Sequence, residues 1–193
     1  MAKNILYIHG FNSAGGGHKA QLLQEMFPEC KVLSPTFDCK NPQAIRSKLD
    51  SLMRTQNIRM VIGTSLGGFF ALYCSMKHHK QAVIINPTTK PSQTLRKFIG
   101  KQKNFVTGEV YQVTEADIAK YEKFEDDIMA GLEPDNNLVH FVLATDDELL
   151  GDHTYLEQKF SQCHDFNYFD GQGHRFTSVK IIRHILQDAL SKA

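Results

Sequence analysis

Short apolar runs alternate along this chain with segments of helical periodicity. Six runs rich in branched and aromatic residues are predicted to be strands, at 5–8, 31–33, 60–63, 82–85, 138–144 and 165–169. Runs such as Val83-Ile84-Ile85 are apolar without alternation, which is typical of strands covered on both faces. Strands that alternate with helices favour a parallel sheet flanked by helices. The predicted fold class is therefore α/β, with a mostly parallel sheet of about six strands.

Three of the helical segments have recognisable ends or faces. Asn41 is predicted to cap a helix that begins with Pro42 at its first position. The segment 66–79 has almost no polar face, so it predicts a buried helix. The last helix, at about 177–190, has one apolar stripe and is predicted to pack on the sheet.

One connection is much longer than the others. About fifty residues separate the fourth and fifth predicted strands, whereas such connections usually need about 2–6 outside their helices. The pattern Thr114-x-x-Asp117 predicts the start of a helix, with Ile118, Tyr121, Phe124 and Ile128 along one side. We interpret residues 1–193 as a single domain with a cap or lid inserted at about 87–137.

Composition narrows the class of protein without naming a chemistry. The formal net charge of the 193 residues is only +1, which provides no general attraction to nucleic acid or to a membrane surface. The four cysteines lack zinc-type spacing, so reduced thiols are expected. Neither a signal peptide nor an apolar run of about 18 residues is apparent. We expect a cytoplasmic protein without nucleic-acid or membrane partners, and its oligomeric state stays open.

The strongest chemical signal is the pattern Gly63-Thr64-Ser65-Leu66-Gly67. This G-x-S-x-G match follows a predicted strand and opens the buried helix, which is the context that a nucleophile elbow needs. Glycines on both sides of the serine remove Cβ atoms that would collide in so sharp a turn. Ser65 is therefore predicted to be a nucleophile, in preference to the alternative that it merely caps the helix.

A serine nucleophile needs a base, and in this kind of fold the base comes late in the chain. His174 fits, because it lies in the glycine-rich loop after the last predicted strand. The orienting carboxylate is expected after the preceding strand, where three acids are adjacent. We favour Asp147 over Asp146, with Glu148 third. The order Ser65, Asp147, His174 is the order of an α/β-hydrolase.

An oxyanion hole needs two hydrogen-bond donors. The N–H of Leu66 is expected to be one, because Leu66 follows the nucleophile and begins a helix. The loop after the first strand should supply the other, and the Phe11 N–H is the candidate. His9, in the same loop, suits a structural hydrogen bond better than a second catalytic base. The other histidines have no metal-ligand spacing, so neither metal nor cofactor is expected.

Several of these motifs together resemble a known group of proteins. The opening Ile5-Leu6-Tyr7-Ile8-His9-Gly10-Phe11-Asn12-Ser13, the elbow 63–69, Asn86-Pro87 and Gly173-His174 look like the small bacterial YqiA/YcfP-type esterases, over nearly the whole chain. The resemblance implies an α/β-hydrolase with esterase activity on short acyl esters. The family's Thr-x-Asp-Glu pattern is matched by Thr145-x-Asp147-Glu148, which implies that Asp147 is the acid.

These observations predict a serine hydrolase, a carboxylesterase that cleaves short-chain acyl esters through an acyl-enzyme on Ser65. The expected partner is a small-molecule acyl ester or thioester. A thioesterase or acyltransferase could use the same three residues, because nothing in them recognises the leaving group. A non-catalytic binding protein that kept the fold is a further alternative. The sequence leaves the physiological substrate and the acyl-chain length open.

Overall fold

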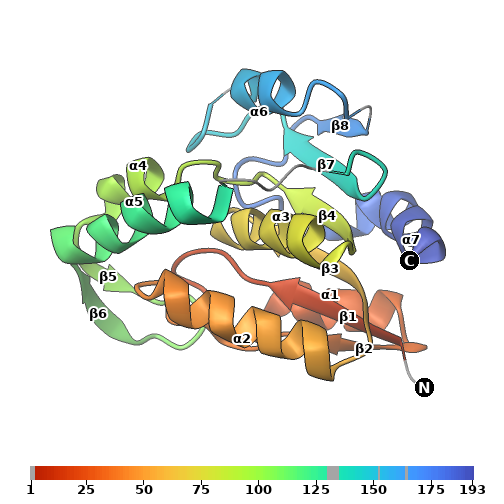
Figure 1. Cartoon of the computed structure of the whole chain (residues 1–193), viewed down its shortest axis with the longest axis horizontal. Coiled ribbons are helices and arrows are strands. Elements are labelled where there is room, and N and C mark those ends of the chain that lie inside the picture. Colours follow the sequence, from red (N-terminus) through yellow and green to blue (C-terminus); the bar gives the residue numbers. More distant parts are fainter. Residues whose placement is uncertain (1–2, 130–134, 152, 164) are drawn as a thin grey trace.

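The computed structural model describes residues 3–129, 135–151, 153–163 and 165–193, with the side chains of 126–129 left out. Six parallel strands form its central sheet (Figure 1). In chain order they are β1 (Lys3–Ile8), β2 (Cys30–Leu33), β3 (Ile58–Thr64), β4 (Gln81–Ile85), β7 (Val139–Ala144) and β8 (Phe166–Phe169). Their order across the sheet is β2-β1-β3-β4-β7-β8. The predicted fold class is confirmed, and each predicted strand is present within one or two residues of its expected ends.

Helices cover both faces of this sheet (Figure 1). One face packs against α1 (His18–Met26), the 3-10 turn η2 (Val179–Ile182) and α7 (Arg183–Lys192), and the other against α2 (Pro42–Thr55) and α3 (Leu66–His78). A short helix, α6 (Thr154–Lys159), precedes β8. The predicted helix at 177–190 is corrected: its first turn is the tighter η2, and its last helical residue is Lys192.

Alternate residues of each strand belong to two separate hydrophobic clusters. In β1, Ile5 and Tyr7 pack towards α1 and α7, whereas Leu6 and Ile8 pack towards α3. Strands that are apolar at every position supply both clusters at once, which explains the absence of alternation in the sequence. No helix among the described residues has the length and apolar character needed to cross a bilayer.

Helix α3 lies unusually close to the sheet because two glycines permit it. A Cβ at Gly67 would lie 2.1 Å from the carbonyl oxygen of Ile8, and one at Gly63 would lie 2.2 Å from the carbonyl oxygen of Gly67. Neither distance is possible for a real side chain. The glycines predicted to clear space around Ser65 therefore do so by letting β1, β3 and α3 approach backbone to backbone.

The long connection between β4 and β7 folds into several small elements. They are α4 (Pro91–Leu95), the 3-10 turn η1 (Arg96–Phe98), an antiparallel pair β5 (Gly100–Lys103) and β6 (Val110–Val113), and α5 (Glu115–Met129). Thr114 and Asp117 form the predicted capping box: the Thr114 N–H donates to Asp117 at 3.0 Å and the Asp117 N–H to Thr114 Oγ1 at 3.3 Å. The side chain of Ile128 and residues 130–134 lie outside the described part of the chain.

The strand order predicts a crevice at the carboxyl ends of two central strands, β1 and β3. From β1 the chain crosses to its neighbour β2 on one side, and then returns to β3 on the other side. The loops that follow β1 and β3 consequently diverge at the carboxyl ends of these two adjacent strands. In open α/β sheets, ligands bind at such a switch point.

Candidate active site

Ser65 lies in the turn between β3 and α3, in a backbone conformation that is rare for a residue with a side chain. Its φ is 56° and its ψ is −119°. A conformation of this kind costs roughly 1–3 kcal/mol and persists only where the surroundings impose it. Here the Ser65 N–H donates to the carbonyl of Ile85 at 2.9 Å, and the Ser65 carbonyl accepts from the N–H groups of Gly68 and Phe69. The turn is therefore fixed by β4 on one side and by α3 on the other.

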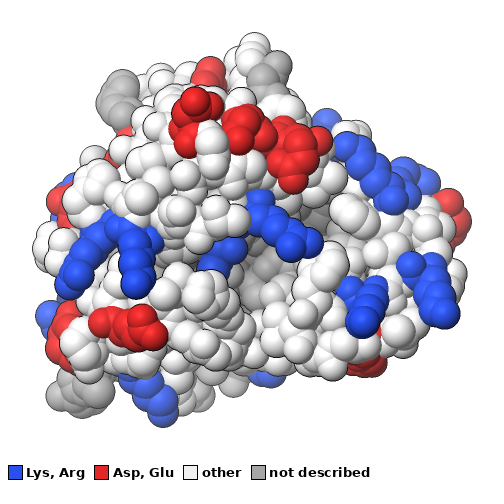
Figure 2. All heavy atoms as spheres, turned by 180° about the vertical axis from the view of Figure 1, so that it is seen from behind, with Lys and Arg blue, Asp and Glu red and all other residues white. Residues whose placement is uncertain are grey.

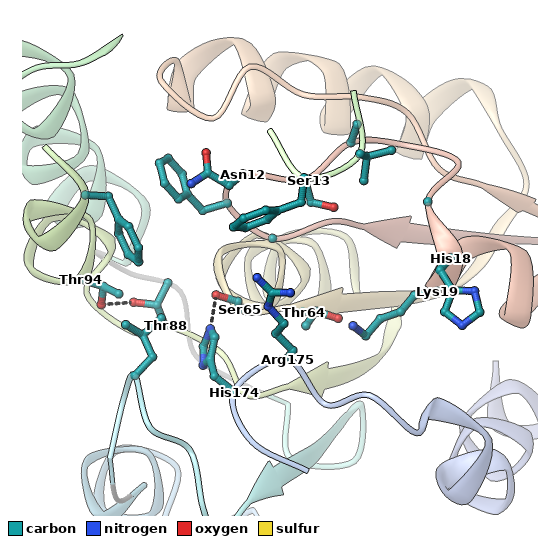
Figure 3. A pocket seen from close by; sticks show the side chains of 18 of the residues that line it. Asn12, Ser13, His18, Lys19, Thr64, Ser65, Thr88, Thr94, His174 and Arg175 are labelled. Carbon is teal, nitrogen blue, oxygen red and sulfur yellow. Dashed lines mark hydrogen bonds between the residues drawn. The ribbon is translucent and has the colours of Figure 1, made fainter. Parts of the chain in front are cut away.

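The Ser65 hydroxyl points away from the helix that follows it. Ser65 occupies the N-cap position of α3, yet its side chain makes no capping hydrogen bond. Instead, its Oγ lies 2.8 Å from Nε2 of His174, as the dashed line in Figure 3 shows. The interpretation of Ser65 as an ordinary helix cap is therefore wrong.

His174 is held in turn by a carboxylate. Its Nδ1 lies 3.0 and 2.9 Å from the two side-chain oxygens of Asp147, and both residues are buried. Because Nδ1–H donates to Asp147, Nε2 is left to accept from the serine hydroxyl. Burial acts to raise the pKa of Asp147, but hydrogen bonds from His174, Leu150 and Leu149 outweigh it and hold that pKa below its ordinary value.

The two other acids of this loop bind the backbone next to His174. The Asp146 carboxylate accepts from the N–H groups of Gln172 and Gly173 at 3.1 and 3.0 Å. The Glu148 carboxylate accepts from the His174 N–H at 2.8 Å. All three adjacent acids thus contact residues 172–174, but Asp147 is the one that contacts the imidazole.

Asn86 connects the same loop to the sheet. This residue follows β4, is completely buried and has a positive φ of 41°. Its side-chain N–H₂ donates to the carbonyls of Gly173 and His174, both at 3.0 Å, and its oxygen accepts from the Ala144 N–H at 2.7 Å. One amide therefore joins the carboxyl ends of β4 and β7 to the loop that carries the imidazole.

The loop after β1 lies directly against the serine. A Cβ at Gly10 would be 3.3 Å from Cβ of Ser65, so Phe11 begins beside that serine. Neither the Phe11 nor the Leu66 N–H has an acceptor among the described residues. His9 holds this loop in place, because its Nε2 accepts from the Phe37 N–H at 3.0 Å and its Nδ1 donates to the Gly10 carbonyl at 2.9 Å. Burial lowers the pKa of His9, and the structural role predicted for it is confirmed.

A cavity of about 690 Å³ opens above Ser65 and His174. One wall is apolar and comes from the segment between β4 and β7, with Leu95 and Phe98. Figure 2 shows the hollow from outside. Its volume lies within the range of about 300–1,000 Å³ that is usual for small-molecule sites.

The described residues include one cluster of possible metal ligands. Potential ligand atoms of His140, Asp165 and Asp188 lie within 4.8 Å of one another. His140 is near the start of β7, at the amino-terminal ends of the strands, whereas Ser65 lies at their carboxyl ends. Nδ1 of His140 already contacts the Asp165 carboxylate, and Asp188 forms an ion pair with Lys192 at 2.6 Å. Both carboxylates thus already have a side-chain partner within the protein.

Sequence reasoning missed the supporting residues of this site. The sequence indicated Asn86 only through the family resemblance, and Asp146 and Glu148 only as alternatives to Asp147 for the orienting acid. Lys19 and Arg175, which also line the cavity, were not singled out. A usable signal existed for Asn86 alone, since a polar residue at the end of an apolar strand lies at the edge where the other loops meet.

Known proteins are similar to this chain along its length. A UPF0227 protein from Pectobacterium atrosepticum is 23% identical over 182 residues, covering 91% of this chain and 92% of its own. The solved structure of a putative hydrolase of the alpha/beta superfamily from Xanthomonas campestris pv. campestris matches with a TM-score of 0.62 and 17% identity, covering 100% of both chains. A monoacylglycerol lipase from Paleococcus ferrophilus matches with a TM-score of 0.66 and 11% identity, covering 98% of this chain and 95% of its own.

At these identities the likeness to solved structures shows the fold, which is that of the α/β-hydrolases. The structural neighbours include esterases and lipases. The pattern of the family described as "Uncharacterised protein family (UPF0227)" matches residues 4–190. The expected resemblance to YqiA/YcfP-type proteins is thereby confirmed, and the chain belongs to the UPF0227 family.

Proposed function

We propose that this protein is a serine hydrolase, a carboxylesterase that cleaves short-chain acyl esters through an acyl-enzyme on Ser65. The observation that carries the proposal is the direction of the Ser65 hydroxyl. The hydroxyl makes no capping hydrogen bond to α3, and its oxygen lies 2.8 Å from Nε2 of His174. The other ring nitrogen of His174 contacts the buried carboxylate of Asp147. A nucleophile, a base and an orienting acid within hydrogen-bond reach are the arrangement that acyl transfer requires.

In this mechanism His174 takes the proton of Ser65 as the oxygen attacks the acyl carbonyl. Asp147 keeps the imidazole in the tautomer that can accept that proton and stabilises the imidazolium that forms. The Phe11 and Leu66 N–H groups donate to the oxyanion, since both lie beside Ser65 without an acceptor among the described residues. The imidazolium then protonates the leaving alcohol, and water hydrolyses the acyl-enzyme.

The segment 87–137 acts in this proposal as a cap over the site. Thr94, Leu95 and Phe98 of its first turns line the cavity, as do Phe105 and Val106 of its hairpin. The hairpin is tied to the catalytic core, because the Phe105 N–H donates to the Asn12 carbonyl at 2.8 Å. Such a wall suits a small acyl ester, the substrate type that the esterases and lipases among the structural neighbours suggest.

Covalent labelling with a fluorophosphonate tests the proposal. The wild-type protein should be labelled stoichiometrically, and the label should map to the peptide that carries Ser65. Ser65→Ala should abolish labelling and lower kcat/KM for 4-nitrophenyl butanoate by at least about 10⁴-fold.

Ser75→Ala is the matched control, because Ser75 is a buried serine of α3 whose hydroxyl has no hydrogen-bond partner among the described residues. This variant should be labelled like the wild type. A folded wild-type protein that stays unlabelled would show that the protein is not a serine hydrolase. A Ser65→Ala variant that labels equally well would show that Ser65 is not the nucleophile.

A further inference from the structure

The cavity above Ser65 is not uniformly apolar. Leu95, Phe98 and Leu149 form the apolar wall, whereas Lys19 and Arg175 bring two positive charges to another part. In Figure 3 the ends of both side chains turn towards Thr64 and Ser65. The reaction proposed for Ser65 has no use for either cation, since the base, the acid and the oxyanion donors are already present.

Neither cation has a carboxylate partner among the described residues. No ion pair joins Lys19 or Arg175 to an acid in residues 3–129, 135–151, 153–163 and 165–193. Arg175 instead lies over the ring of Phe105, with 4.5 Å between its guanidinium carbon and the ring centroid. This contact keeps the guanidinium beside the cavity without neutralising it.

The surroundings of Lys19 disfavour its positive charge. Burial lowers the pKa of Lys19, and the nearby charge of Arg175 lowers it further. Lys19 also lies in the first turn of α1, where the partial charge of the helix end is positive. The positive charges of Lys19 and Arg175 and the N-terminus of α1 thus lie around one cavity. A bound anion would reduce the repulsion between them.

One acid in the described part of the cavity wall opposes the binding of an anion. Glu148 is the carboxylate among the described lining residues. Its Oε2 is bound to the His174 N–H at 2.8 Å, which directs the charge at the loop backbone. Figure 2 shows lysine and arginine side chains on the rim of the hollow. The balance of charge near Ser65 therefore favours an anion.

We infer that Lys19 and Arg175 form an anion-binding subsite of the esterase site, so that the preferred substrates are esters with a carboxylate or phosphate group near the scissile bond. This inference rests on the proposed function. The anionic group pairs with the ammonium of the half-buried Lys19 and with the guanidinium of the exposed Arg175 through charge-assisted hydrogen bonds. The neutral part of the substrate then occupies the apolar wall.

Matched pairs of charged and neutral esters test the subsite. On the acyl side, 4-nitrophenyl hemiglutarate is compared with 4-nitrophenyl pentanoate, which has the same chain length and leaving group. On the alcohol side, 4-carboxyphenyl butanoate is compared with 4-carbamoylphenyl butanoate. Rates without enzyme are subtracted, and the quantity compared is the charged-to-neutral ratio of kcat/KM. Because both esters are measured on one preparation, a partly misfolded variant does not distort this ratio.

Lys19→Gln and Arg175→Gln should each lower that ratio by about tenfold in at least one of the two pairs. The pair that responds identifies the side of the ester on which the anion lies. Lys123→Gln, which removes an exposed lysine of α5 outside the cavity, should leave the ratio unchanged. Inhibition of wild-type hydrolysis by free glutarate more than by inorganic phosphate would assign the subsite to carboxylates, and the reverse order to phosphates.

Wild-type ratios near one for both pairs, or ratios that the two variants leave unchanged, would overturn the subsite. In that case Ser65 would still be labelled by fluorophosphonate, and the proposed hydrolase activity would stand. A protein that neither labels nor hydrolyses any of the four esters would overturn both proposals.

Discussion

The strained backbone conformation of Ser65 determines where its hydroxyl oxygen lies. Its positive φ turns the side chain out of the helix N-terminus and towards His174. Only glycine fits at positions 63 and 67 beside this turn, because a neighbouring backbone atom lies too close to where a Cβ would be. At the scale of single residues, the site depends on which small groups are absent as much as on which functional groups are present.

The same scale separates the roles of the three adjacent acids. Asp147→Asn keeps the volume of the side chain but removes the charge and presents a donor to Nδ1 of His174, which favours the wrong tautomer. If the proposed triad operates, we expect kcat/KM for 4-nitrophenyl butanoate to fall by roughly 10⁴-fold, the loss typical of this substitution in a serine hydrolase triad. Asp146→Asn changes a carboxylate that, among the described residues, accepts from the N–H groups of Gln172 and Gly173 and does not contact the imidazole, so a loss of about tenfold or less is expected. A larger loss in Asp146→Asn than in Asp147→Asn would contradict the assignment.

At the scale of elements, the site is a meeting of strand ends. The ends of β3, β4 and β7 and the loop after β8 come together because the strands are parallel and adjacent. Asn86 is where these ends are joined, since its one side chain binds the backbones of Ala144, Gly173 and His174. The position of the imidazole is therefore linked to the order of the strands.

Replacing Asn86 by Asp tests this link. The new oxygen would face the Gly173 and His174 carbonyls where an N–H₂ group now donates, leaving buried acceptors without a donor. Each such loss costs about 1–3 kcal/mol, so we expect an unfolding free energy lower by about 2–5 kcal/mol and a reduced kcat. Urea denaturation and ester hydrolysis measure the two effects.

Asn41→Asp makes the same chemical change at a position where only the oxygen is used. Asn41 caps α2 by accepting from the Ala44 N–H at 3.1 Å, which a carboxylate does equally well. This control should keep its stability within about 0.5 kcal/mol. Equal losses of unfolding free energy in Asn86→Asp and Asn41→Asp would mean that the hydrogen bonds donated by Asn86 do not contribute specifically to stability.

At the scale of the whole molecule, ionised carboxylates connect elements that are distant in sequence. Asp50 of α2 accepts from Tyr73 at 2.8 Å and Lys77 at 3.0 Å, both of α3, and contacts His78 at 2.8 Å. Burial raises the pKa of Asp50, but these hydrogen bonds outweigh that effect and lower it below the ordinary value. The pKa values of Asp117 and Asp147 are lowered in the same way.

Acid should therefore destabilise the protein in a predictable direction. A carboxylate whose pKa is lower in the folded state stabilises the fold above its unfolded pKa, near 3.9, and loses that contribution as the pH falls through the folded value. We expect the unfolding free energy from urea titrations to decline as the pH is lowered from about 5. Asp50→Asn should make the decline shallower, because one of these protonations is removed. Parallel curves for the two proteins would contradict the role of Asp50.

Much of the fold was predictable because it depends on local patterns. Apolar runs of three to seven residues locate the six strands of the central sheet within two residues of their ends. The caps Asn41 and Thr114–Asp117 locate the starts of α2 and α5. The hairpin β5–β6 was not predicted, since Lys101 and Lys103 make its first strand mostly polar and none of the four residues of that strand is fully buried. The 3-10 turn η2 was likewise hidden within a helical periodicity that both helix types share over a few residues.

The amino-acid sequence by itself determined the α/β fold class, the sharp turn at Ser65 and the set of groups from which a base and an acid could come. Each of these follows from residue types at short spacing. The tertiary structure alone decided that Asp147, and not Asp146 or Glu148, faces the imidazole, that Asn86 holds the His174 loop, and that Lys19 and Arg175 share the cavity. These arrangements bring together residues up to 156 positions apart, from 19 to 175, and depend on side-chain directions that only the packed strands and loops impose.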